Sequence, residues 1–376
     1  MTKVLVCGYY GAHNRGDELI LKVLTDYLKT RQAEVVVTSQ DPAATAADYG
    51  VSAIKAHPSL RKGLGSFLRE VSKADLFILG GGGLYQDYGK HFRVVLYYGM
   101  RVLIAGILGK KVAYFALGFG NIELARSKRF IALVTRLVHC ITVRDQGSRE
   151  VLARIGVNQE IVVCADPVFS LATGVLPAPR GAEPKAGLRV GISILAYDRQ
   201  LQFATGADQR IEQTVTSFTK TLLAQGHQVT FIPMEKGTDD LFIREILARA
   251  GLTGSVAVLD SSLKHDAFLA AFAGFDLVLA MRLHAIILSA ALGIPFVPIS
   301  YHTKVSNTVA LLGQEDLMIP LEELSAERLE QSFKLLVQDY QRRQETVIEE
   351  CAALKRETAR LFSSLDRLLP PAAEAP

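Results

Sequence analysis

The stretch FDLVLAMRLHAIILSAALGIPFVPIS, residues 275–300, indicates the fold because two short apolar runs flank an apolar segment of helix length. The runs FDLVLA and IPFVPIS are typical of buried strands, and the segment between them is typical of a core helix. Arg282 and His284 stand where the first strand gives way to the helix. Polar groups set into an apolar stretch are usually paired, hydrated or in contact with a ligand. Parallel α/β sheets bind their ligands at this end of a strand.

The same alternation of strand and helix extends along the rest of the chain. Strand-like runs before residue 172 are KVLVCGYY, AEVVVTS, ADLFILGGGG, KKVAYFALG, CITVRDQGS and EIVVCADPVF, and further runs after residue 187 are LRVGISIL, HQVTFIPM and SVAVLD. Strands that alternate with helices indicate parallel sheets with helices on both faces. The sequence therefore predicts an α/β protein with two Rossmann-like lobes facing a cleft, which is a GT-B-like architecture.

The expected domain boundaries come from one stretch of different composition. Residues 172–187, ATGVLPAPRGAEPKAG, lack periodicity and are rich in Pro, Gly and Ala, as a linker is. A chain of 376 residues also suits two domains. We expect an N-terminal lobe over residues 1–175, a linker over 176–187 and a C-terminal lobe over 188–320. The amphipathic run over 321–368 predicts a C-terminal helical segment, interruptible near Ser325 and Ser363.

Composition and charge exclude several classes of protein. Hydrophobic residues make up 49% of the chain and charged residues 21%, which is ordinary for a globular protein. The net charge of +4 is too small and too scattered to indicate nucleic-acid binding. No apolar run supplies about 20 residues to span a bilayer, and the first residues look like a strand. No spacing typical of metal ligands occurs, so we expect a cytoplasmic enzyme without a metal.

Two glycine-rich loops follow strands in the first lobe. GYYGAHNRGDE, residues 8–18, crowds polar groups before a helix for which Asp17 is a candidate N-cap. LGGGGLYQD, residues 79–87, would expose backbone N–H groups to an anion or to sugar oxygens. Neither loop has the pattern of a nicotinamide site or a P-loop. A capped turn and close packing of helix on sheet are the structural alternatives.

Basic residues follow three further strands. Arg144 lies in CITVRDQGS, Arg282 precedes the apolar helix, and Lys304 lies in SYHTKV. Three cations that converge without nearby partners would repel one another, and a small anion with more than one charge would relieve that repulsion. His284 is the residue among them that titrates near neutral pH. An Arg144–Asp145 surface pair and a buried core histidine are the structural alternatives.

Five motifs, in this order, resemble the polysaccharide pyruvyl transferase family over residues 1–310. They are GYYGAHNRGDE, GGGGLYQD, ITVRDQGS, CADPVF and MRLHAIILSAALGIPFVPISYHTKV. The branch that the chain most resembles modifies cell-wall polymers for the anchoring of surface-layer proteins. The resemblance implies a GT-B-type fold and phosphoenolpyruvate as co-substrate, with no other cofactor. The implied reaction builds a pyruvate ketal across two sugar hydroxyls and releases phosphate.

The resemblance also implies roles for single residues. Arg144, Arg282 and Lys304 would bind the donor, and His284 would be catalytic. An Arg and Lys fork suits the carboxylate and phosphate of the donor, and ketal formation needs a proton at C3, which a histidine can supply. The acceptor side would include Asn14, Arg15, Asp17, Gly81, Gly82, Gly83 and Asp87.

The resemblance implies a saccharide acceptor on a lipid carrier, and therefore an enzyme at the inner membrane face. Basic residues flank apolar stretches of the first lobe and would be attracted to anionic lipid, although they could merely solubilise the lobe: Arg61, Lys62, Arg69, Lys110 and Lys111.

Three other functions stay open. One is a nucleotide-sugar glycosyltransferase with the same fold. Another is a non-catalytic two-lobe protein that binds an anion or a sugar. The last is a scaffold that uses the terminal helix to bind partners.

Overall fold

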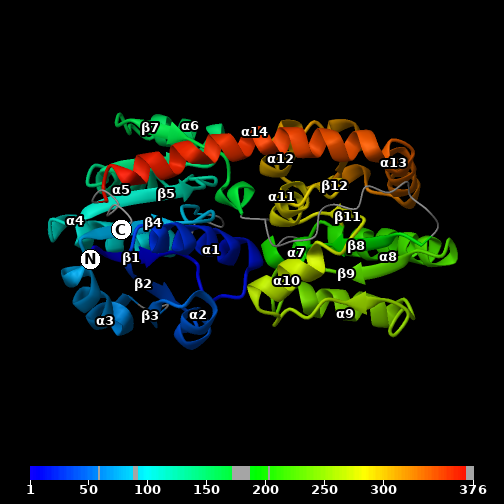
Figure 1. Ribbon diagram of the computed structural model, residues 1–376, viewed down its shortest axis with the longest axis horizontal. Coiled ribbons are helices and arrows are strands. Elements are labelled where there is room, and N and C mark those ends of the chain that lie inside the picture. Colours follow the sequence, from blue (N-terminus) through cyan, green and yellow to red (C-terminus); the bar gives the residue numbers. More distant parts are fainter. Residues whose placement is uncertain (58–59, 88–91, 172–186, 202–203, 370–376) are drawn as a thin grey trace, which may run out of the picture. The chain divides into compact units, whose positions relative to one another are not determined.

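The computed structural model describes residues 1–57, 60–87, 92–171, 187–201 and 204–369. These residues form two compact units (Figure 1). Unit 1 comprises Met1–Ser170 and Leu354–Pro376, and unit 2 comprises Leu171–Ala353. Each unit is built on one parallel sheet, which confirms the predicted fold class. The predicted linker lies outside the described residues except for Gly187.

The sheet of unit 1 has the order β3-β2-β1-β4-β5-β6-β7, and all neighbouring strands are parallel. The strand order reverses between β1 and β4. The strands are β1 (Lys3–Cys7), β2 (Glu34–Ser39), β3 (Ser52–Lys55), β4 (Leu76–Gly80), β5 (Lys111–Leu117), β6 (Cys140–Val143) and β7 (Ile161–Val163). The helices are α1 (Arg15–Thr30), α2 (Pro42–Tyr49), α3 (Leu60–Lys73), α4 (Phe92–Ile107), α5 (Ala125–Thr135), α6 (Gln146–Arg154) and the 3₁₀-helix η2 (Pro167–Ser170).

Alternate side chains of these strands enter two different layers of unit 1. Leu5, Phe77 and Tyr114 belong to one apolar core with residues of α3, α4 and α5. Phe115, the next residue along β5, instead contacts Phe362 near the C-terminus of the chain. The two-residue period of a strand therefore places α3, α4 and α5 together on one face of the sheet.

The sheet of unit 2 has the order β10-β9-β8-β11-β12-β13, again parallel, and its order reverses between β8 and β11. The strands are β8 (Arg189–Ser193), β9 (Gln228–Phe231), β10 (Ala257–Val258), β11 (Leu277–Ala280), β12 (Phe296–Ser300) and β13 (Ile319–Pro320). The helices are α7 (Tyr197–Leu201), α8 (Ala207–Ala224), α9 (Asp239–Arg249), α10 (His265–Phe272), α11 (Leu283–Ala291), α12 (Thr303–Leu311), η3 (Glu315–Leu317), η4 (Leu321–Glu323), α13 (Ala326–Gln338) and α14 (Tyr340–Asp366).

The C-terminal helical segment is divided between the units, because α14 begins in unit 2 and ends in unit 1. Ser325 caps α13 by accepting a hydrogen bond from the N–H of Arg328, as the interruption predicted there requires. The interruption predicted near Ser363 is wrong. Ser363 lies inside α14, where its hydroxyl donates to the carbonyl of Arg360, and the helices separate at Asp339 instead. No helix in the described ranges is long and apolar enough to cross a membrane.

The two units share one detail at the amino edge of their sheets. Asp75 precedes β4 and accepts a hydrogen bond from the N–H of Lys3, the first residue of β1. Asp276 precedes β11 and accepts the same bond from Arg189, the first residue of β8. Each aspartate thus links the starts of the two central strands, between which the strand order reverses.

We expect Asp276→Ala to lower the free energy of unfolding by about 1–3 kcal/mol, because Asp276 also accepts two bonds from the guanidinium of Arg189. Denaturant unfolding measures the change. Asp26→Ala, which removes an exposed helical pair with Lys22, is the control and should cost about 0.5 kcal/mol or less. Equal losses in the two variants would contradict a special role for Asp276.

Candidate functional site

Most of the residues predicted for the site lie near the points where the strand order reverses, whereas Arg144 follows β6 and Lys304 follows β12. In unit 1 the loops after β1 and β4 carry the NRGDE and glycine motifs. In unit 2 the loops after β8 and β11 occupy the same position, and Arg282 directly follows β11. Ligands of open α/β sheets bind in the crevice that such a reversal leaves at the carboxyl edge. We therefore treat the carboxyl edge of each sheet as the candidate site of its unit.

Asn14 is the N-cap of α1, and the prediction that Asp17 is the cap is wrong. The Oδ1 atom of Asn14 accepts hydrogen bonds from the N–H groups of Gly16 at 3.0 Å and Asp17 at 3.4 Å. Asp17 lies in the first helical turn, where the helix dipole favours a carboxylate. The preceding residue, His13, is exposed and has φ of +57°, a backbone conformation that residues other than glycine rarely adopt.

Asp17, the glycine loop and Arg144 form a row along the carboxyl edge of unit 1. A Cβ atom on Gly82 would collide with the carboxylate of Asp17, so the side chain lies directly against the glycine backbone. The carbonyl of Gly82 accepts the N–H of Gly118 at 2.9 Å. A Cβ on Gly118 would in turn lie 2.9 Å from Nε of Arg144. The structure thus brings residues of three separate motifs together.

Arg144 is not a cation without a nearby partner, so that expectation is wrong. Its Nη1 atom donates to Oδ2 of Asp166 at 3.1 Å, and both side chains are buried. The N–H of Val168 donates to the other oxygen of Asp166. The structural alternative, a surface pair of Arg144 with Asp145, is also wrong. Asp145 instead caps α6, where its carboxylate accepts a hydrogen bond from the N–H of Ser148. Sequence reasoning missed Asp166, although it lies in the quoted CADPVF motif.

The other predicted acceptor residues of unit 1 are enclosed. Gly81 and Gly82 are buried with φ of +75°, and Gly83 is half-buried. The N–H of Gly81 donates to the carbonyl of Phe115, so the expectation that this loop exposes its N–H groups is wrong at Gly81. Arg15 is also buried. Asp87 is also buried, and its two carboxylate oxygens accept the N–H groups of Glu123 and Leu124.

Glu18 is a buried carboxyl group that sequence reasoning did not place in the site. The N–H of Gly11 donates to Oε1 at 2.7 Å, and the hydroxyl of Tyr49 contacts both Oε2 and the carbonyl of Glu18. One hydroxyl proton cannot serve both oxygens fully, so a protonated Glu18 satisfies this arrangement best. Burial raises the pKa of Glu18 to about 7, although the bonds from Tyr49 and Gly11 oppose the increase.

In unit 2, two carboxylates hold the guanidinium of Arg282. Its Nε atom donates to Asp239 at 2.9 Å, and Nη2 donates to Asp239 and to Glu235. Asp239 is fully buried and accepts the N–H groups of Met234 and Glu235 as well. Burial alone would lower the pKa of Arg282, but Asp239 raises it well above its usual range. The expectation of a cation without partners is therefore wrong for Arg282 too.

His284 and Lys304 occupy matching positions on neighbouring helices of unit 2. Each is the second residue of its helix, α11 or α12, and each helix begins just after one of the adjacent strands β11 and β12. Both side chains are half-buried. His302 caps α12, with Nδ1 accepting the N–H of Lys304 at 3.1 Å. Of the predicted donor residues, unit 2 thus carries Arg282, His284 and Lys304, and unit 1 carries Arg144.

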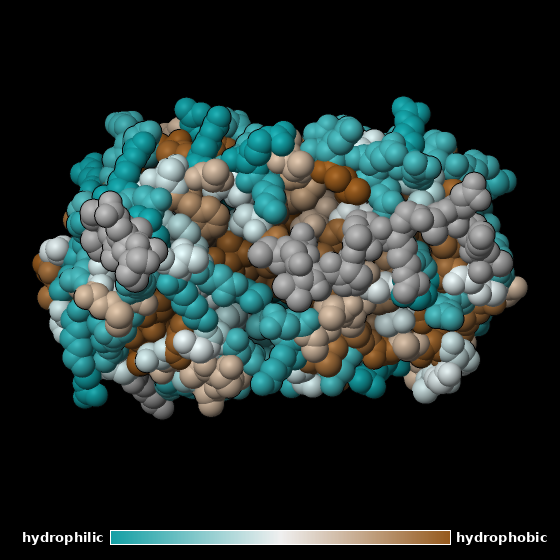
Figure 2. All heavy atoms as spheres, in the orientation of Figure 1, coloured by the Kyte–Doolittle hydropathy of each residue, from teal (hydrophilic) through white to brown (hydrophobic). Residues whose placement is uncertain are grey.

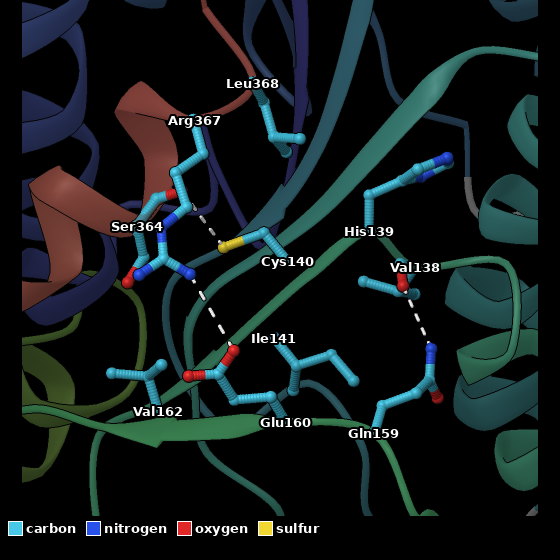
Figure 3. Close-up of a pocket in the computed structure, with 10 residues that line it drawn as sticks. All are labelled: Val138, His139, Cys140, Ile141, Gln159, Glu160, Val162, Ser364, Arg367 and Leu368. Atoms are coloured by element: carbon cyan, nitrogen blue, oxygen red, sulfur yellow. Dashed lines mark hydrogen bonds and ion pairs between the residues drawn. The ribbon is translucent and has the colours of Figure 1, made fainter.

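A pocket of about 280 Å³ lies elsewhere, at the amino edge of the sheet of unit 1 (Figure 3). Arg367 reaches Glu160 there at 3.7 Å, and the thiol of Cys140 points toward the carbonyl of Ser364. Burial raises the pKa of Cys140 to about 11, so the thiol is not a ready nucleophile. None of the predicted site residues lines this pocket, so the pocket is separate from the candidate site. No cluster suited to a metal ion occurs in the described residues.

Residues 14–303 match the sequence model of one family, described as polysaccharide pyruvyl transferase. The chain belongs to this family. It is therefore an enzyme, and the family's activity is the transfer of pyruvyl groups to polysaccharide. No curated protein matches the chain by sequence.

Solved structures similar to this pyruvyl transferase show the same fold at low identity. The UDP-GlcNAc 2-epimerase of Neisseria meningitidis, bound to UDP-GlcNAc, has 13% identity and a TM-score of 0.63, covering 98% of this chain and 100% of that one. Alr3699/HepE of Anabaena, in complex with UDP and glucose, has 12% identity and a TM-score of 0.62, covering 98% and 99%. The UDP-GlcNAc 2-epimerase of Methanocaldococcus jannaschii has 12% identity and a TM-score of 0.61, covering 90% and 93%. These similarities support the GT-B-like fold alone.

Glu18→Gln should flatten the dependence of stability on pH. The unfolded chain releases the Glu18 proton near pH 4.5 and the folded enzyme near pH 7, so the free energy of unfolding falls as the pH rises between these values. The loss amounts to about 3 kcal/mol. Urea unfolding of both proteins at about pH 5 and pH 8 measures the difference. Identical pH dependence in the variant and the parent enzyme would show that Glu18 titrates normally.

Arg144→Ala should destabilise unit 1 by about 3–5 kcal/mol, because it leaves the carboxylate of Asp166 buried without its cation. The double variant Arg144→Ala, Asp166→Ala should recover part of that loss. Arg367→Ala is the matched control, since its pair with Glu160 is largely exposed and contributes about 1 kcal/mol or less. Denaturant unfolding compares all three, and an additive double variant would contradict the pairing.

Proposed function

We propose that this enzyme transfers pyruvate from phosphoenolpyruvate to two hydroxyls of one sugar and releases phosphate. The acceptor is a lipid-linked precursor of a cell-wall or surface polysaccharide, of the kind that anchors surface-layer proteins. The observation that carries this proposal is the matched placement of His284 and Lys304 at the starts of α11 and α12, beside the strand reversal of unit 2. The polysaccharide pyruvyl transferase family of the chain supports the same reaction class.

The start of α11 suits an anionic group of the donor. Its N-cap residue is Arg282, and no side chain caps the helix. A helix N-terminus attracts phosphate and carboxylate through its N–H groups and its dipole. Lys304 adds a cation at the start of the neighbouring helix. Arg282 acts here as a positioning residue, since Asp239 and Glu235 hold its guanidinium and thereby the backbone from which α11 begins.

The reaction needs proton transfers that a histidine can perform. A proton must reach C3 of phosphoenolpyruvate, and the oxygen of the first sugar hydroxyl then bonds to C2 and gives up its proton. The second hydroxyl bonds to C2 and gives up its proton as the C2–O bond to phosphate breaks. Phosphate leaves with the bonding electrons and takes up a proton. His284 is our candidate for the group that supplies the first proton and accepts a later one.

In unit 1 we propose that Asn14 and Asp17 contribute to the acceptor surface, with the buried Gly82 behind the Asp17 carboxylate. The Asp17 carboxylate lies against the Gly82 backbone at the carboxyl edge, where it can accept a hydrogen bond from a sugar hydroxyl. Arg144, oriented by Asp166, remains our candidate for the donor carboxylate. Asp87 and the enclosed Gly81 instead support the loop.

An assay of phosphate release distinguishes this function from nucleotide-sugar glycosyl transfer. Phosphoenolpyruvate and lipid-linked saccharides should yield inorganic phosphate and a product heavier by one pyruvyl group. Release of a nucleoside diphosphate from a nucleotide sugar, without any release from phosphoenolpyruvate, would overturn the proposal.

His284→Gln should lower turnover by about 10²–10⁴-fold and leave phosphoenolpyruvate binding within a few fold, since glutamine cannot exchange a proton near neutral pH. Lys304→Ala should instead weaken phosphoenolpyruvate binding by about ten- to a hundredfold. Turnover and calorimetry measure the two effects.

The matched controls are His227→Gln, at the amino edge of the same sheet, and Lys220→Ala on α8. Neither control variant should change turnover or phosphoenolpyruvate binding. Normal turnover in His284→Gln would remove it as the proton-transfer group, and unchanged donor affinity in Lys304→Ala would remove Lys304 from the donor site.

A further inference from the structure

The helices α4 and α5 expose apolar side chains where they end. Ile107 is 72% exposed and, after Met1, is the most exposed large apolar residue in the described part of the chain. Its neighbour Leu108 is 44% exposed, and Leu133 on α5 is 51% exposed. A surface helix usually turns polar side chains to solvent, so an apolar end indicates a contact.

These residues lie at the same end of unit 1 because α4 and α5 are packed side by side in parallel. A Cβ on Gly99 would meet Phe130, and a Cβ seven residues later on Gly106 would meet Leu137. Equal steps on both helices mean that they run in the same direction. The ends of α4 and α5 therefore lie together at the amino edge of the sheet, where β5 and β6 begin.

The same segment concentrates positive charge. Residues 92–139 contain eight Lys and Arg residues and one acidic residue, Glu123, a net charge of +7. The whole chain carries +4, so all other residues together carry −3. Arg129, Leu133 and Arg136 follow one another at intervals of four and three on α5, which places them on one stripe of the helix. All three are exposed.

No acidic side chain in the described residues neutralises this face through an ion pair. Arg129 and Arg136 form none among those residues, and Lys110 and Lys111 donate to the carbonyls of Ser72 and Leu368. Two acids at the amino edge have other partners: Glu70 pairs with Lys3 and Lys73, and Glu160 pairs with Arg367.

We propose that this face, made of Ile107, Leu108, Leu133, Lys110, Lys111, Arg129 and Arg136, docks on an anionic phospholipid bilayer. Apolar side chains enter the interfacial region while the surrounding cations meet the headgroups. In Figure 2, brown spheres lie at the left edge of the view, where Figure 1 labels α4. Two copies facing each other through this surface would bring like charges together, which disfavours a second copy as the occupant.

The proposed surface differs from the one expected from the sequence. The predicted basic residues were Arg61, Lys62, Arg69, Lys110 and Lys111, and the side chains of Arg61 and Lys62 lie outside the described part. The docking surface keeps Lys110 and Lys111 and adds α5. It goes beyond the proposed reaction, because lipid attraction at this face requires neither donor nor acceptor.

Sedimentation of the full-length protein with vesicles tests the proposal, in the absence of any saccharide. Vesicles of phosphatidylcholine with about one third phosphatidylglycerol should bind it, and phosphatidylcholine alone should bind about tenfold less. Raising NaCl from about 50 to 500 mM should release it. Equal binding to both vesicle types, or no binding to either, would overturn the proposal.

Two pairs of variants locate the surface. Arg129→Gln with Arg136→Gln should weaken binding about tenfold or more, whereas Lys220→Gln with Arg244→Gln, which removes equal charge from exposed positions of unit 2, should change it little. Ile107→Ser with Leu108→Ser should also weaken it, by about fivefold or more, whereas Leu241→Ser with Leu311→Ser should not. Circular dichroism and denaturant unfolding check that each variant is folded.

Equal effects of a variant and its control would overturn the assignment to this face. So would a dimer that dissociates in the Ile107→Ser, Leu108→Ser variant, since it would make a second copy the occupant. Displacement from vesicles by RNA, together with unchanged binding in the apolar variant, would identify a nucleic-acid surface instead.

Discussion

All strands within each sheet run in the same direction, and the placement of the site depends on this constraint. Parallel strands end at one edge, so loops that are far apart in sequence meet there. In unit 1 this edge brings the loop before α1, the glycine loop and Arg144 into one row. In unit 2 it brings the starts of α11 and α12 together. In open α/β sheets, the reversal of strand order is where a ligand crevice forms at this edge.

Charges gathered at a buried edge must be balanced, and this enzyme balances its arginines internally. Arg144 pairs with Asp166, and Arg282 pairs with Asp239 and Glu235. Removing such groups from water costs several kcal/mol, so a buried pair is weak evidence for stability. Its clearer effect is orientation, because a guanidinium that is hydrogen-bonded to a buried carboxylate has few alternative positions. The multiply charged anion expected from three converging cations is therefore not needed to neutralise the arginines, and Lys304 carries more of the argument for a donor.

The sequence was a good guide to the strands and a poor one to the partners of the charged groups. Long apolar runs located β1, β4, β5, β11 and β12, since burial on both faces leaves a continuous pattern. β3 and β13 were missed. β3 has four residues, of which the first and last are exposed, and β13 has only two residues, so neither gives a continuous apolar pattern. Asp166 and Asp239 lie 22 and 43 residues from their arginines, and no local periodicity encodes a contact across the fold. The choice of Asp17 over Asn14 as cap failed because both residues can cap a helix, and only the backbone geometry decides between them.

The net charge of the whole chain did not reveal the concentration of basic residues in unit 1. A net charge of +4 is consistent with scattered basic residues, yet it is the sum of +7 over residues 92–139 and −3 elsewhere. Part of that asymmetry has a structural cause, because helices end at the amino edge of a parallel sheet and their C-terminal dipoles favour cations. Lys110 and Lys111 fit this explanation, since both bond to backbone carbonyls. The dipole does not explain Ile107 and Leu108, which gain nothing from exposure to water. One edge of the sheet in unit 1 therefore carries the proposed acceptor residues, and the opposite edge carries the proposed docking surface.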